Sequence, residues 1–148
     1  AARNTTAVTD MAAKRAAGVF ALALLLATAC GDAASDEATL GTLQNDGPVR
    51  VSSQARVDVE LRPTAPIKLG KNTVVVSFPA NAHVELASAS ALMPAHGHGS
   101  PAPKIERGDE GEFLIRDLVL YMSGRWELRL GLRVDARDDE VIVAVDVP

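Results

Sequence analysis

The chain has little of the material that small domains use to hold themselves together covalently, and little that enzymes use for chemistry. Only one of its 148 residues is cysteine, so no disulfide can form within the chain. Histidine occurs three times, and aromatic residues make up 3% of the sequence. It contains no nucleophile elbow, no phosphate-binding loop and no paired Cys-His signal. We therefore expect a domain held by its apolar core alone, and no enzymatic activity.

Long apolar runs are lacking except near the start. Residues 1–29 comprise an upstream extension, 1–10, followed by a segment with the layout of a signal peptide. Two basic residues precede the apolar run 16–26, and the small residues 27–29 follow it ahead of Cys30. As a helix, the run and the small residues would cover roughly 21 Å at about 1.5 Å per residue, against about 30 Å of bilayer core. A transmembrane span is therefore the weaker interpretation.

The single cysteine stands where this leader would be cleaved. The segment 26–31, LATACG, resembles the lipobox of bacterial lipoproteins, with Ala27 where leucine is commoner. The resemblance implies that the Cys30 thiol is acylated and anchors the protein to a membrane on the extracytoplasmic, periplasmic side. Because Gly31 follows the cysteine, an outer membrane is favoured where one exists. An ordinary secretory leader with a free or buried cysteine is the alternative.

From Cys30 onward the chain carries 12 Lys and Arg against 18 Asp and Glu, a net charge of 12 − 18 = −6. This charge argues against nucleic acid or an anionic membrane surface as a partner. Residues 31–48 contain few large apolar residues and several acids. We predict that residues 30–49 comprise the lipidated cysteine and a flexible tether.

Residues 50–148 show period-two alternation of apolar and polar residues, and nothing after Cys30 has helical periodicity. Within 112–121 the apolar residues alternate in two different registers, Phe113 and Ile115 in one and Leu118 and Leu120 in the other. This change indicates a bulge or bend near Asp117. The pattern predicts an all-β fold, an immunoglobulin-like antiparallel two-sheet sandwich of about seven strands. The predicted strands are 57–61, 74–78, 82–92, 104–107, 112–121, 126–134 and 141–147, the last after an acidic turn, 135–140.

The loop 92–101 holds two of the three histidines, His96 and His98, on irregular backbone, where binding residues are often carried. Imidazole suits copper(II) and zinc, and thioether suits copper(I), so Met93 and Met122 are candidate ligands beside them. Strand counting puts Met122 at the same end of the sandwich as the loop, provided that 104–107 is a strand. We predict a copper site formed by Met93, His96, His98 and Met122.

Three segments together resemble one family: PIKLGKN at 66–72, MPAHGHG at 93–99 and YMSGRWEL at 121–128. They are similar to the YtkA-like domain and to FixH-type proteins, over roughly residues 57–147. The resemblance implies an immunoglobulin-like sandwich on the outer side of a cell membrane and a link to copper handling. The commoner family pattern has a second methionine where Ala95-His96 stands here.

Other interpretations stay open. The alternative for the histidines is a solvated loop, and the alternative for the methionines is packing at the rim of the core. Without a metal, the domain would be an interaction module that meets a membrane or envelope protein, or a carrier of an apolar ligand. His83 and the acidic turn 135–140 are expected on the surface, and Trp126 in the core.

Overall fold

The computed structural model describes residues 40–44 and 47–148, which form ten β-strands and no helix. The predicted leader and Cys30 lie outside the described residues. In the described part of the chain, no helix is long and apolar enough to cross a membrane.

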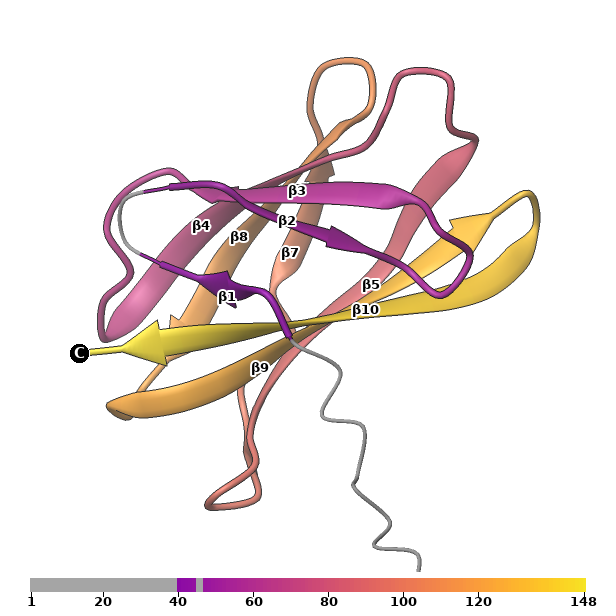
Figure 1. Cartoon of the computed structure of the whole chain (residues 1–148). Coiled ribbons are helices and arrows are strands. Elements are labelled where there is room, and N and C mark those ends of the chain that lie inside the picture. The colour runs from indigo at the N-terminus through magenta and orange to yellow at the C-terminus, as the bar shows by residue number, and fades with distance from the viewer. Residues whose placement is uncertain (1–39, 45–46) are drawn as a thin grey trace, which may run out of the picture. The chain divides into compact units, whose positions relative to one another are not determined.

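The strands form two five-stranded sheets that pack face to face (Figure 1). The first sheet has the order β1-β10-β9-β5-β6 and the second β2-β3-β4-β8-β7. The first consists of β1 (Thr42–Leu43), β10 (Arg137–Val147), β9 (Gly124–Val134), β5 (Val84–Met93) and β6 (His98–Gly99). The second consists of β2 (Val49–Ser52), β3 (Asp58–Pro63), β4 (Gly70–Ser77), β8 (Glu112–Leu120) and β7 (Lys104–Arg107).

The predicted sandwich is confirmed, and its seven predicted strands correspond to β3, β4, β5, β7, β8, β9 and β10. Their order, β3-β4-β8-β7 against β5-β9-β10, is that of a constant-type immunoglobulin domain. The estimate of about seven strands was low, because β1, β2 and β6 add short edge pieces in the described chain. The first sheet is also not purely antiparallel, since β1 runs parallel to β10.

The core lies between the two sheets, and β9 contributes its centre. Trp126, Leu128 and Leu130 on β9 are fully buried. They lie opposite Val145, Val143 and Val141 of β10, which point to the same face. The apolar residues whose alternation predicted these two strands are therefore the residues that the structure buries.

The folded part begins earlier than the predicted boundary at residue 50. Thr42–Leu43 pair with Ala144 and Val145, and the Leu43 side chain is fully buried. Gly41 makes this possible, because a Cβ there would lie 2.5 Å from Val51 Cγ1. The predicted tether therefore extends too far. The burial of one leucine stabilises this segment. The prediction missed it because residues 31–48 on average contain few large apolar residues.

The predicted acidic turn, 135–140, is shorter in the structure. Asp135 and Ala136 both have positive φ, 46° and 63°, as a two-residue type I′ hairpin requires. β10 starts directly afterwards, with Arg137 opposite Val134. The prediction missed this turn because Asp-Ala lacks the glycine that usually marks it.

The predicted irregularity near Asp117 is confirmed as a bulge. Arg116 and Asp117 together face the single residue Thr73, and Asp117 has a φ of 56°. The bulge turns the Asp117 carboxylate toward the ammonium groups of Lys71 at 3.0 Å and Lys104 at 3.1 Å. Their hydrogen bonds and charges lower the pKa of Asp117, Lys71 contributing most.

We expect Leu130→Ala to lower the free energy of unfolding by about 2–5 kcal/mol, because it leaves a cavity between the sheets. Leu69→Ala is the matched control. Leu69 is 50% exposed, so the loss should stay within about 0.5 kcal/mol. Urea denaturation followed by circular dichroism measures both. Equal midpoints for the two variants would contradict the assignment of the core.

We also expect Asp117→Asn to change how stability depends on pH. Because the pKa of Asp117 is lowered on folding, its ionised form stabilises the protein above the unfolded pKa of about 3.9. That contribution is lost as pH falls through the folded pKa. The variant should therefore be less stable than the wild type near pH 7, and the difference should vanish in acid.

Asparagine retains the size of aspartate and tolerates positive φ, so the bulge is preserved. The double variant Lys71→Gln with Lys104→Gln should reproduce the effect in thermal unfolding measured across pH. A difference between Asp117→Asn and wild type that persists unchanged in acid would exclude this ion-pair origin.

Candidate functional site

The histidine loop forms a tight hairpin at the end of β5. The His96 N–H donates to Met93 O at 3.2 Å and the Gly97 N–H to Pro94 O at 3.4 Å. Proline fits the first turn position because its φ is fixed there, and Gly97 supplies a φ of 65°. His98 then lies opposite Met93 in the short edge strand β6. The irregular backbone predicted for 92–101 is thus confirmed for His96 in the turn 94–97, whereas His98 lies in a strand.

Ser100 ties this hairpin to both sheets. Its N–H donates to Ala91 O of β5 at 2.8 Å, and its Oγ donates to Val119 O of β8 at 2.6 Å. The chain then crosses to the second sheet and forms β7, so the condition for the predicted juxtaposition is met. The loop between β8 and β9, residues 121–123, therefore lies beside the hairpin. We call this the histidine end of the sandwich: the described loops 64–69, 94–97, 100–103 and 121–123.

Four aromatic rings follow one another from this surface into the core. The His96 and His98 rings are nearly parallel, with centroids 6.2 Å apart and an interplanar angle of 12°. The His98 ring lies 6.3 Å from that of Tyr121, which lies 5.2 Å from that of Trp126. Tyr121 also donates its hydroxyl to Gly99 O at 3.2 Å. Both imidazoles are exposed, whereas Trp126 is fully buried.

Met93 lies at the histidine end but faces the core. It is 4% exposed, and its Cε would be 2.8 Å from a Cβ at Gly124. A bulge explains this direction, because Ala87 is an extra residue between Leu86 and Ser88 in the pairing of β5 with β9. The extra residue reverses the alternation, so Met93 points inward where an unbroken strand would point it outward.

Met122 is half-buried and packs against the core cluster. Its carbonyl oxygen accepts a hydrogen bond of 3.0 Å from Trp126 Nε1. The two predicted thioethers thus lie at the same end as the imidazoles while contributing to packing. In residues 40–44 and 47–148, no three His, Cys, Asp or Glu side chains converge as a metal cluster would require. A metal at this end would therefore need thioether, water or backbone ligands beside the two imidazoles.

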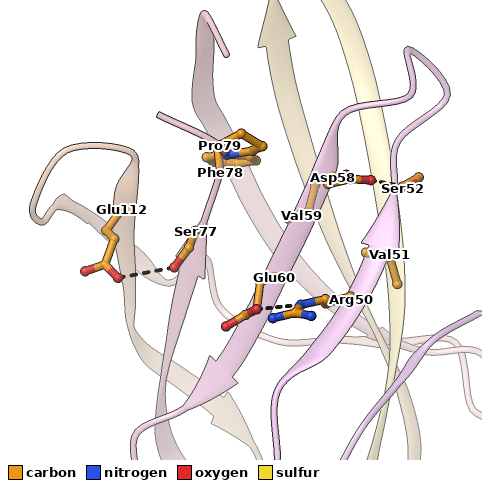
Figure 2. Close-up of a pocket in the computed structure, with 10 residues that line it drawn as sticks. All are labelled: Arg50, Val51, Ser52, Asp58, Val59, Glu60, Ser77, Phe78, Pro79 and Glu112. Carbon is orange, nitrogen blue, oxygen red and sulfur yellow. Dashed lines mark hydrogen bonds and ion pairs between the residues drawn. The ribbon is translucent and has the colours of Figure 1, made fainter. Parts of the chain in front are cut away.

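A separate cavity of about 720 Å³ lies over the outer face of the second sheet (Figure 2). Its polar groups satisfy one another. Arg50 Nε donates to Glu60 at 2.7 Å, and Ser77 Oγ donates to Glu112 at 3.3 Å. Neither histidine nor cysteine lines this cavity. It therefore offers less for ligand chemistry than the histidine end.

The third histidine, His83, is exposed in the loop that precedes β5, at the opposite end of that strand from the hairpin. This agrees with its expected surface position. Sequence reasoning did not place Tyr121 between His98 and Trp126, nor Leu69 next to it. The position of Leu69 follows from the pairing of Gly70 with Leu120, and that of Tyr121 from the loop between β8 and β9, and no local pattern encodes either.

Comparison with known proteins finds no family model, no curated protein and no solved structure that matches the chain. The resemblance to the YtkA-like domain therefore stays a prediction.

We expect Gly124→Ala to destabilise the protein by about 1–3 kcal/mol or more, since residues other than glycine are strained at a φ of 117°. The added methyl would also meet the buried Met93 side chain. Gly99→Ala is the control at the same end, where the nearest atom to an added Cβ lies at 3.9 Å. Thermal unfolding distinguishes them. An unchanged midpoint for Gly124→Ala would contradict this packing.

Proposed function

We propose that the protein is a non-enzymatic β-sandwich module, lipid-anchored through Cys30 on the extracytoplasmic face of a membrane, which binds one copper ion through His96 and His98. The anchoring part is supported by the leader and the lipobox-like segment in the sequence. The metal part is supported by the geometry of the two imidazoles, and this observation carries the proposal.

The separation of the rings suits a shared ion. A metal-bound imidazole nitrogen lies about 2.0–2.1 Å from the ion. Adding about 1.1 Å from nitrogen to ring centre, two rings on one ion have centroids at most about 6.4 Å apart. The observed centroid distance of 6.2 Å is within this limit and corresponds to nitrogens on nearly opposite sides of the ion. The two rings are stacked, so both side chains would have to turn to bind it. Because both side chains are exposed, they can turn their nitrogens toward the ion with little cost in packing.

The methionines would serve as auxiliary ligands that favour copper(I). Met93 shares a sheet face with His98, since the two lie opposite each other in β5 and β6. Its thioether would have to move out of the core to reach an ion. We therefore assign the stronger binding to the imidazoles and to copper(II), with Met93 and Met122 adding to copper(I) affinity.

Calorimetric titration of the full chain with copper(II) tests the proposal, in a Cys30→Ser background that removes the competing thiol. We expect one ion to bind more tightly than about 10 μM, or about 7 kcal/mol. His96→Ala with His98→Ala should weaken binding by more than about tenfold, or about 1.4 kcal/mol. Nitrogen hyperfine structure in the copper(II) electron paramagnetic resonance spectrum should disappear with it.

His83→Ala is the matched control, because this exposed histidine precedes β5 instead of following it. It should leave both the affinity and the spectrum unchanged. Met93→Leu with Met122→Leu should weaken copper(I) selectively. Copper binding that survives loss of both hairpin histidines, or that is weaker than the stated affinity in the parent chain, would refute the metal site.

A further inference from the structure

The histidine end also carries the two exposed large hydrophobic side chains of the described chain, Leu69 at 50% exposure and Tyr121 at 44%. The pairing of Gly70 with Leu120 brings them together, since each is the neighbouring residue just beyond that pair. Half-buried Met122 follows in the chain. We call Leu69, Tyr121 and Met122 the apolar patch. Single exposed hydrophobic residues are ordinary, but the gathering of both at one end requires a reason.

Charge is also divided between the two ends of the sandwich. Among the described loop residues of the histidine end, Lys68 is charged and no carboxylate occurs. Arg125, at the start of β9, is also exposed, and it lies opposite the exposed Asp146 of β10. The described loops of the opposite end, 53–57, 78–83, 108–111 and 135–136, contain Asp109, Glu110 and Asp135 against Arg56. The overall negative charge therefore does not describe the histidine end.

We propose that the histidine end docks on the surface of a phospholipid bilayer, with Leu69 and Tyr121 in the interfacial layer and Lys68 toward the lipid phosphates. Tyrosine and apolar side chains with flanking cations are the residues that interfaces of bilayers accommodate. The opposite end, with its loop carboxylates, then points away from the membrane. This inference rests on the lipid anchoring proposed above and not on copper.

The proposed anchor at Cys30 would keep the histidine end within reach of a bilayer. Ten residue steps separate Cys30 from Leu40, at most about 35 Å of extended chain. The sandwich would thus be held close to the lipid. Weak contacts by two side chains become effective when a tether raises their local concentration. Because the apolar patch adjoins His98 through Tyr121, docking would place the imidazoles at the lipid surface.

Resonance energy transfer measures this orientation without labelling the protein. Trp126 is the only tryptophan, and its ring lies 5.2 Å from that of Tyr121. The full chain is reconstituted into vesicles of phosphatidylcholine and phosphatidylglycerol in equal parts, with and without dansyl-labelled lipid headgroups. We expect efficient transfer in the wild type and at least a twofold lower efficiency for Leu69→Glu with Tyr121→Glu.

Gln54→Glu with Ala80→Glu is the matched control, since it adds the same charge at exposed positions of the opposite end. It should keep the transfer efficiency of the wild type. Leu69→Glu alone, which leaves the Tyr121 hydrogen bond to Gly99 in place, should give an intermediate efficiency. Circular dichroism confirms that each variant is folded.

Co-sedimentation of the chain with the vesicles reports anchoring separately from docking. Equal transfer in the wild type and in Leu69→Glu with Tyr121→Glu would overturn the docking proposal while leaving anchoring intact. Absence of transfer in the wild type would overturn it as well, whether or not the chain sediments with lipid. Loss of sedimentation on Cys30→Ser would establish the anchor without bearing on the orientation.

Discussion

The burial of Trp126 is the constraint on which the rest of the histidine end depends. Its indole is fully enclosed between the sheets, and a buried N–H is costly unless it is bonded. Met122 O accepts that hydrogen bond, so the turn after β8 must hold its carbonyl at one position. The turn then leads into Gly124, whose backbone leaves room for the Met93 side chain. The hydrogen bond that buried Trp126 requires thus fixes the turn against which Met93, the residue before the histidine hairpin, packs.

Local pattern predicts most of this fold because most of its strands bury one face. Alternation in β9 and β10 has the period of a half-buried strand, so it identifies both elements without any tertiary information. The bulge at Asp117 was also predictable, since it separates two registers of apolar residues in β8. The short strands β1 and β6 have two residues each, too few for any period. They form because each pairs with the edge of a longer strand, β1 with β10 and β6 with β5.

The candidate site was predictable in its location and not in its details. Strand counting placed Met122 at the end where the histidines lie, because antiparallel strands alternate in direction. The parallel imidazoles and the position of Tyr121 depend on the turn geometry and on a register set by distant residues. The inward direction of Met93 departs from simple alternation because of Ala87, an extra residue in a segment of small side chains whose apolar pattern is too faint to reveal it.

The two ends of the sandwich thus have different chemistry on one scaffold. One end presents imidazoles, exposed apolar side chains and few charges, while the other presents most of the loop carboxylates. The ion pairs of Asp117 with Lys71 and Lys104 link three strands of the second sheet without reaching either group of loops. The imidazoles are therefore separate from the residues that stabilise the fold, whereas Met93 packs in the core and Met122 against it, and both belong to the proposed copper site.

The bulge in β5 gives chain length an influence that no substitution at the site would have. Ser88 lies over Gly131, where a Cβ would meet the Ser88 side chain, so the glycine leaves room for the bulge. Removal of Ala87 by a single-codon deletion would restore regular alternation. Ala89, Ala91 and Met93 would still face inward, because Ser88 alone would then take the outward place that Ala87 and Ser88 now share. A one-residue insertion between Ala89 and Met93 would instead reverse the alternation and turn the Met93 thioether toward solvent, so the length of this part of β5 determines whether sulfur is available at the surface.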